Sequence, residues 1–316
     1  MSDLKIGIIG CGRMGKERAR SAAACGAQVS IVHDEDRERA QSLASQYAGC
    51  VVADQAAEVV RRNPQAIFVC SPPSARGPVE LAAIAAGIPF FVEKPIGVTA
   101  AQAAPILEEL DKTSLVHAVG YQNRCRSSVV HAKQVLEGRT ILAISAFWAG
   151  RKYLVPWWLR SEDSGGPVNE QATHLIDLCR FLCGEIVELS SALGSAEGDA
   201  SEPLSAALTL RFESGAFASL FYSCEANDKQ IGLRIITKQG GLTLSSWDLA
   251  LTQNEIDSTG ITTHAEDIFV LETRQFLKAV RADDPTKVAC TFDDAWRTQQ
   301  MVDRIRASNR QYWMAQ

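Results

Sequence analysis

One short stretch of the sequence places two opposite charges at the end of an expected strand. In the segment FFVEKP, the apolar residues 90–92 run into Glu93 and Lys94, and Pro95 prevents the strand from continuing as a central one. A lysine at this position can hydrogen-bond a substrate hydroxyl and stabilise the alkoxide that develops as a hydride leaves. The local sequence favours equally a simpler role, in which Lys94 pairs with Glu93 on the surface.

A second stretch, GGPVNEQATHLIDL, places a carboxylate and an imidazole four residues apart. On a helix that begins near Asn169, Glu170 and His174 would share one face. Histidine titrates near neutrality, which suits general acid–base work on a hydroxyl, and a neighbouring carboxylate can orient the ring or hold an adjacent hydroxyl. The alternative is a satisfied core histidine on an apolar helix, because apolar residues follow it.

A glycine pattern near the N-terminus predicts a phosphate-binding loop. Gly10, Gly12 and Gly15 form GxGxxG between an expected strand and an expected helix. The first glycine permits a tight turn, the second lets the backbone approach a pyrophosphate, and the third lets helix and strand pack closely. We therefore expect this loop, with Arg13 and Met14, to bind a dinucleotide, and a glycine-rich turn without a ligand is the alternative.

The cofactor preference depends on the end of the second expected strand. Asp34 follows the loop by about 20 residues, where an acid can bind the adenosine ribose 2′-hydroxyl and repel a 2′-phosphate. This favours NAD, but NADP stays open because Arg37 is close enough to compensate for that charge. In the alternative interpretation Asp34 is a capping or turn acid.

The elements that position these residues change in kind along the chain. Over residues 1–122, short apolar runs alternate with helical patterns, which indicates βαβ units and a doubly wound parallel sheet. Ligands of such α/β sheets lie beyond the carboxyl ends of the strands. The expected strands are 5–9, 28–33, 50–53, 66–70, 89–92 and 115–119, and the expected helices are 14–25, 37–47, 56–63, 79–86 and 101–112. We therefore expect one cofactor crevice lined at these strand ends by Ser71, Pro72, Glu93, Lys94 and Asn123.

Residues 123–316 are expected to form an α+β domain for substrate binding and oligomerisation. The runs 206–212 and 216–222 flank a short turn and indicate an antiparallel hairpin, so we expect a predominantly antiparallel, open-faced sheet. An uncovered apolar face predicts a homodimer or homotetramer. The other expected strands are 141–148, 233–238 and 242–246, and the expected helices are 127–137, 171–182, 269–281 and 293–308.

Aromatic residues before the Gly-Gly pair suggest a surface for a sugar or polyol. Tyr153, Trp157 and Trp158 could cover C–H patches of a sugar while Arg160 binds hydroxyls. Packing or a subunit contact explains the same residues equally well. Tyr121, at a strand end, and Gln171, beside Glu170, are further candidates for substrate contact.

Composition excludes several classes of partner. The chain has 316 residues, 46% hydrophobic, and a formal charge of −5 with interspersed signs, so we expect a folded protein that binds neither nucleic acid nor a membrane. The longest nearly uncharged apolar run, 81–92, is too short to span a bilayer, and the N-terminus does not resemble a signal peptide, so we expect a cytoplasmic protein. The nine cysteines lack a CxxC pattern, so we expect reduced thiols and no metal site.

Taken together, these motifs resemble the Gfo/Idh/MocA family of glucose–fructose oxidoreductases and inositol dehydrogenases. The resemblance rests on GxGxxG, the acid after the second strand, the tripeptide EKP at 93–95, and Gly-Gly followed by a histidine-bearing helix, and it extends from Ile6 to the last helix. It implies a catalytic Lys94, a cis Lys94–Pro95 bond, and NAD(P)-dependent hydride transfer at a secondary alcohol of a sugar, inositol or related polyol. The sequence departs from the family at Glu170, where Asp is usual, and at Arg76, where many members carry His.

Two other functions stay open. A protein of the same fold can bind a dinucleotide and regulate without catalysis, but the presence of both Lys94 and His174 favours an enzyme. A dehydrogenase of the same family acting on a non-sugar substrate is the second alternative.

Overall fold

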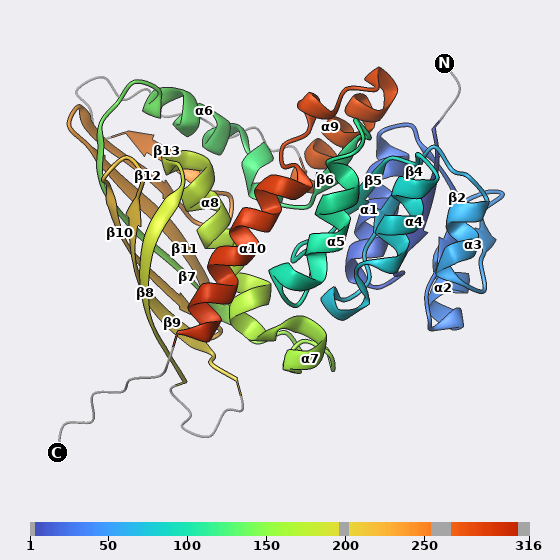
Figure 1. Cartoon of the computed structure of the whole chain (residues 1–316), viewed down its shortest axis with the longest axis horizontal. Helices are drawn as coiled ribbons and strands as arrows, with labels where there is room; N and C mark the ends of the chain where they lie inside the picture. The colour runs from blue at the N-terminus through green and yellow to red at the C-terminus, as the bar shows by residue number, and fades with distance from the viewer. Residues whose placement is uncertain (1–3, 196–201, 254–266, 309–316) are drawn as a thin grey trace. The chain divides into compact units, whose positions relative to one another are not determined.

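The computed structural model describes residues 4–195, 202–253 and 267–308, which form two compact units (Figure 1). The first unit comprises Met1–Gln122 and Glu266–Arg297, and the second comprises Asn123–Ala265 and Thr298–Gln316. The sequence analysis assigned residues 266–297 to the second domain. They join the first unit because Phe276, Leu277 and Ala279 pack into its hydrophobic core.

The first unit contains a six-stranded, fully parallel sheet. Its order is β3-β2-β1-β4-β5-β6, so β1 has β2 on one side and β4 on the other. Strands β2 and β3 are added outward on one side of β1, and β4 to β6 are added outward on the other side. This confirms the expected doubly wound arrangement, in which ligands bind at the carboxyl ends near the switch point. The strands are β1 (Lys5–Ile9), β2 (Gln28–His33), β3 (Val51–Val52), β4 (Ala66–Val69), β5 (Phe90–Val92) and β6 (His117–Val119).

Helices cover both faces of this sheet because successive strand side chains point to opposite faces. In β5, Phe91 packs in one buried cluster with Phe276, while Phe90 and Val92 lie in another with Phe292. The helices of this unit are α1 (Arg13–Ala24), α2 (Arg37–Ala44), α3 (Ala56–Arg61), α4 (Pro78–Ala85), α5 (Ala100–Leu110) and α9 (Ile268–Ala282), with 3-10 turns η1 (Pro73–Ala75) and η4 (Pro285–Lys287). The boundary between the units falls within η2 (Gln122–Cys125) and again within α10 (Phe292–Ala307).

The second unit contains a seven-stranded sheet of order β13-β12-β11-β7-β10-β9-β8. Its pairs are antiparallel except for β7 with β10, and β9 with β10 forms the expected hairpin. The strands are β7 (Ile141–Arg151), β8 (Ile186–Gly194), β9 (Ser205–Phe212), β10 (Phe217–Ser223), β11 (Glu225–Thr237), β12 (Gly240–Ser245) and β13 (Ala250–Gln253). The helical segments are α6 (Ser127–Leu136), α7 (Ser161–Ser164), the π-turn η3 (Val168–Ala172) and α8 (Thr173–Cys183).

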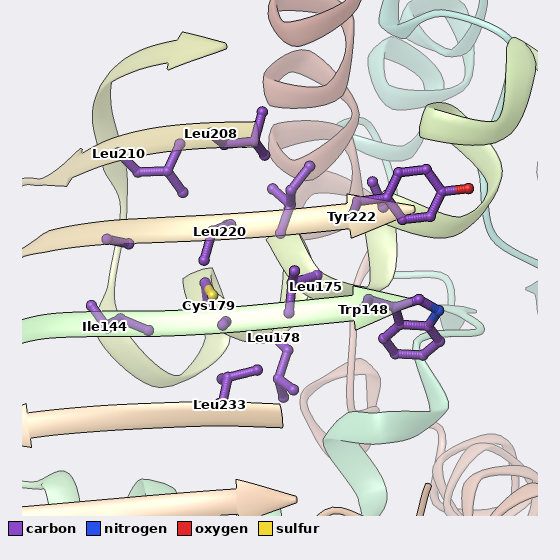
Figure 2. Close-up of a cluster of buried hydrophobic side chains, with 14 of the residues drawn as sticks. Ile144, Trp148, Leu175, Leu178, Cys179, Leu208, Leu210, Leu220, Tyr222 and Leu233 are labelled. Atoms are coloured by element: carbon purple, nitrogen blue, oxygen red, sulfur yellow. The ribbon is translucent and has the colours of Figure 1, made fainter. Parts of the chain in front are cut away.

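One face of this second sheet is packed and the other is exposed. Figure 2 shows Leu175, Leu178 and Cys179 of α8 lying against inward side chains of β7, β9, β10 and β11. On the opposite face, Phe217 is 57% exposed and Phe221 is 48% exposed. The open face expected from the sequence is therefore present, and the homodimer or homotetramer inferred from it stays a prediction.

Two local features differ from the sequence analysis. The edge strands β8 and β13 are not predicted by it, because edge positions lack a clear apolar alternation. The segment expected to begin a regular helix near Asn169 is instead a π-turn, and α8 starts only at Thr173.

Among the helices of the described ranges, none is long and apolar enough to cross a bilayer.

Candidate active site

The first and third glycines of the loop after β1 are required by packing. Gly10 has a φ of +87°, and a Cβ there would lie 2.7 Å from the backbone carbon of Cys70. A Cβ on Gly15 would lie 1.8 Å from the carbonyl oxygen of Gly10. The loop, the end of β4 and the first turn of α1 thus approach one another more closely than any side chain would permit.

The second glycine faces open space. A Cβ on Gly12 would meet no atom within 4 Å, and Gly12 caps α1 without any side-chain hydrogen bond. The first N–H groups of a helix have no intrahelical acceptor, and an anion can accept from them. Arg13 is exposed and Met14 half-buried in this first turn. The loop therefore fits the pyrophosphate of a dinucleotide, which would lie over Gly12.

Asp34 braces this loop from the end of β2. One carboxylate oxygen accepts a 2.6 Å hydrogen bond from the backbone N–H of Cys11, and the other accepts from Asp36 at 2.8 Å. A carboxylate has about four acceptor positions, so both hydroxyls of a ribose can still donate to it. Arg37, considered above as compensation for a 2′-phosphate, forms an exposed ion pair with Asp54.

Glu93 is buried in an ionic cluster rather than exposed at the strand end. Its carboxylate accepts from Nε of Arg18 at 2.6 Å, and Nη2 of the same guanidinium donates to Glu272 at 2.6 Å. Arg18 is inaccessible to solvent, and its guanidinium carbon lies 4.3 Å from the centroid of the Phe91 ring. Burial alone would lower the pKa of Arg18, but the two carboxylates outweigh burial and raise this pKa above its usual value.

This cluster fixes the strand end that carries Lys94. A Cβ on Gly120, which follows β6, would lie 2.9 Å from Oε2 of Glu93, so the next strand end also packs tightly on the cluster. Lys94 itself is half-buried, and the Lys94–Pro95 bond is cis, as the resemblance implied. Glu93, considered above as a surface partner of Lys94, instead binds the buried guanidinium of Arg18 at 2.6 Å.

Other residues expected near the cofactor occupy varied environments. Ser71 and Pro72 are half-buried at the end of β4, and Ser71 lies beside Gly10. Tyr121 is 1% exposed in the core of the first unit, so its ring offers almost no surface to a substrate.

Asn123 is buried, and its Oδ1 accepts from Arg126 at 3.0 Å. Its Nδ2 is buried without an acceptor among the described residues, which suits a bound amide or hydroxyl group.

His174 lies in the first turn of α8 and stacks on an indole. Its ring is 5.1 Å from that of Trp148, with an interplanar angle of 7°. Farther along α8, Asp177 accepts from Arg124 at 2.9 Å and 2.6 Å in a buried bidentate pair. Oγ1 of Thr298 also donates to Asp177, at 3.3 Å. The helix carrying the imidazole is therefore anchored along its length.

Glu170 is held by one of the tryptophans assigned above to a sugar surface. Nε1 of Trp158 donates to Oε2 of Glu170 at 3.0 Å, and the Trp158 side chain is fully buried. Its indole therefore orients the carboxylate and has no face open to a ligand. Trp157 is half-buried against the core, and Arg160 is exposed and pairs with Asp163 at 2.5 Å.

Side-chain hydrogen bonds stabilise the π-turn between Gly166 and α8. Asn169 donates to the carbonyl of Ser164 at 2.7 Å and accepts from Gln299 of α10 at 2.7 Å. Gln171 accepts from the hydroxyl of Tyr222 at 3.1 Å. Burial raises the pKa of Tyr222, so this hydroxyl remains a donor. A π-turn winds more widely than an α-helix, so the four-residue spacing alone does not place Glu170 and His174 on one helical face.

The sequence analysis did not identify Arg18, Glu272 or Trp148. Arg18 carries a usable signal, because it lies with Gly15, Ala19 and Ala22 on the buried face of α1. A charged residue at such a position predicts a buried ion pair. Its partner Glu272 could not be identified in the same way, because it is 254 residues away along the chain.

Comparison with known proteins agrees with this geometry. Residues 4–121 match the model described as the Gfo/Idh/MocA oxidoreductase family, NAD-binding Rossmann fold, and residues 131–243 match the Gfo/Idh/MocA C-terminal domain. The chain is 32% identical over 197 residues, 60% of its length, to an inositol 2-dehydrogenase of Acidothermus cellulolyticus, and the match spans only 57% of that relative.

Solved structures share the fold over nearly the whole chain. A UDP-N-acetylglucosamine 3-dehydrogenase of Acidithiobacillus ferrooxidans superposes with a TM-score of 0.87 at 22% identity, covering 98% of this chain and 99% of that one. A levoglucosan dehydrogenase in complex with NADH also gives 0.87, at 20% identity, covering 97% of each chain. These structures support the fold, and the two matched models show that the chain belongs to the Gfo/Idh/MocA oxidoreductase family.

Proposed function

We propose that this protein is an NAD-dependent dehydrogenase that oxidises a secondary alcohol of a sugar, inositol or related polyol, or reduces the corresponding ketone. The observation that carries the proposal is an open, uncapped glycine loop in the same parallel sheet whose β5 end carries Lys94. Family membership and the names of the relatives support it: inositol 2-dehydrogenase and levoglucosan dehydrogenase both act on hydroxyl-rich rings.

The residues divide the work between binding and proton transfer. The loop at Gly12 would hold the pyrophosphate and Asp34 the ribose. A bound nicotinamide supplies the hydride acceptor, which no side chain can replace. Lys94 would donate a hydrogen bond to the reacting oxygen and stabilise its developing negative charge, and His174 would exchange the hydroxyl proton. Glu170, held by Trp158, would bind a second hydroxyl or orient the imidazole.

Substitution of the glycines tests the cofactor assignment. Gly12→Ala should leave the thermal unfolding midpoint unchanged, because its Cβ meets no protein atom, and should weaken NADH binding about tenfold or more by occupying space needed by the pyrophosphate. Gly10→Ala is the matched control: it should destabilise the apoprotein, because its Cβ would clash with the backbone of Cys70 at a φ of +87°. NADH titration by fluorescence measures the first effect. Unchanged NADH affinity in Gly12→Ala would contradict the assignment.

Substitution of Lys94 and His174 tests the chemistry. A screen of polyols and sugars with NAD and NADP should first identify a substrate, with NAD preferred. Lys94→Ala and His174→Ala should then retain NADH binding and lose about 10²- to 10⁴-fold in kcat, the typical contribution of a positioned acid–base group. Normal kcat in either variant would remove that residue from the mechanism. Binding of NADH without turnover of any substrate would instead favour the non-catalytic regulatory protein.

A further inference from the structure

A pocket of about 330 Å³ lies in the second unit beside the Trp148 ring on which His174 stacks. Its walls come from the end of β7, the first residues of β11 and the π-turn, and they include Trp148, Arg151, Tyr153, Gln171, Asp228 and Lys229. Sites that enclose small ligands typically measure roughly 300 to 1,000 Å³, so this pocket has room for about one sugar ring. Nothing in the sequence motifs assigns a role to its charged residues.

Two tryptophans position the ammonium group of Lys229. Its Nζ lies 3.2 Å from the ring centroid of Trp247 and 5.4 Å from that of Trp148. Both distances are within the range of about 6 Å over which an aromatic face attracts a cation. Trp148 also stacks on His174, so this one indole contacts the imidazole and lies near the ammonium group of Lys229.

The second cation of the pocket is also held in place. Nε of Arg151 donates to the carbonyl oxygen of Asn227, which ties the guanidinium of β7 to the start of β11. A guanidinium has five N–H donors in a planar fork that matches a carboxylate or phosphate. The lining thus contains two cations, Arg151 and Lys229, against one acid, Asp228. Beyond it, Arg126 lies against Trp247 with Asp248 nearby, so that pair of charges cancels.

We propose that this pocket binds an anionic group, a carboxylate or a phosphate, carried by the sugar substrate, with Lys229 and Arg151 as its ligands. The ring of the sugar would lie beside Tyr153, which is 38% exposed, because Trp148 itself is buried. The inference rests on the proposed function, because it assumes that a sugar or polyol reacts beside His174. It narrows the substrate class from polyols in general to acidic or phosphorylated sugars.

Equilibrium binding to the full chain in the presence of NADH tests this inference without requiring turnover. The probes are D-glucuronate for a carboxylate, D-glucose 6-phosphate for a phosphate and D-glucose as the neutral reference, each titrated by calorimetry. At least one anionic probe should bind about tenfold more tightly than D-glucose, as expected for a charge-assisted hydrogen bond. Whichever anionic probe binds more tightly identifies the source of the charge.

Substitutions distinguish anion binding in this pocket from nonspecific attraction to surface charge. Lys229→Gln should abolish the preference for the anionic probe and leave D-glucose binding unchanged, whereas Lys238→Gln, an exposed lysine just beyond the far end of β11, should leave the preference intact. Arg151→Gln provides a second variant if Lys229→Gln alters thermal unfolding. Equal binding of all three probes, binding of none, or equal effects of the two lysine variants would overturn the inference. Anionic binding that depends on Lys229, without turnover of any sugar, would support the pocket and refute the dehydrogenase.

Discussion

Lys94 and His174 are supported by contacts of different kinds. Near Lys94, one buried guanidinium, Arg18, binds two buried carboxylates, so these three side chains carry a formal excess of one negative charge. Along the helix of His174, Arg124 pairs with Asp177 and Arg180 pairs with Glu185, and further hydrogen bonds and ring stacking also contribute. A buried charge left without its partner is costly, whereas the loss of one neutral contact is not. The position of the strand end at Lys94 therefore depends on a single residue, Arg18, whereas the position of the helix that carries His174 depends on several contacts.

Both sets of contacts nevertheless include residues of α9 or α10. Glu272 and Thr273 of α9 bind Arg18 in the first unit, and Thr298 and Gln299 of α10 bind Asp177 and Asn169 in the second. Both candidate catalytic residues thus depend on partners contributed by the last two helices. The contacts of Glu272 and Thr273 with Arg18 add to the hydrophobic packing that places α9 in the first unit, although α9 follows the second sheet in the chain.

The largest expected effect comes from Arg18→Met. It removes the guanidinium that both buried carboxylates, Glu93 and Glu272, accept from, and it should cost about 3 to 5 kcal/mol in the free energy of unfolding. Arg124→Met should cost less, because only one carboxylate, Asp177, loses its cation and Thr298 still donates to it. Urea unfolding followed by circular dichroism measures both.

Glu272→Gln serves as the control for this comparison. It removes the excess charge and keeps an oxygen that can accept from Arg18, so it should change stability little. If Arg124→Met destabilised the protein as much as Arg18→Met, the helix of His174 would depend on one residue as strongly as the strand end at Lys94 does, and the comparison would be wrong.

A smaller effect is expected from Trp158→Phe, which preserves most of the buried ring and removes its N–H donor. The buried Oε2 of Glu170 would lose this hydrogen bond, at a cost of about 1 to 3 kcal/mol. If Glu170 acts in the mechanism, kcat/KM should fall about tenfold while the affinity for NADH stays unchanged. Trp157→Phe, at the neighbouring half-buried indole, should preserve kcat/KM. Equal kcat/KM in both variants would assign Trp158 to packing alone.

Local patterns predict the fold of this chain well, because alternation and glycine spacing reflect nearby geometry. The six parallel strands, the hairpin of β9 and β10, and the glycine loop all follow from residues close together in the sequence. The edge strands of the second sheet are the exception, since an edge strand such as β8 has little burial to impose a pattern. The placement of α9 with the first unit depends on long-range packing, which local patterns do not show.

The candidate site is predictable only in part. Residue types and spacing indicate Lys94, His174 and the glycine loop, because each lies in a short motif. The partners of these residues do not appear in the motifs: Glu93 meets Arg18 across 75 residues, and Arg124 meets Asp177 across 53. Trp158 shows the same limit, since an indole that orients a carboxylate and one that stacks on a sugar look alike in sequence.

The most direct test of the central claim is the transfer of label between substrate and cofactor. A substrate from the polyol screen, deuterated at its ring carbons, should yield deuterated NADH with the wild-type protein, as detected by mass spectrometry. Lys94→Ala and His174→Ala should form this product at rates lower by about 10²-fold or more under saturating conditions, because in the proposed mechanism both residues act on the oxygen of the carbon that loses hydride. Unlabelled NADH from every deuterated polyol and sugar, or undiminished label transfer in both variants, would contradict the account.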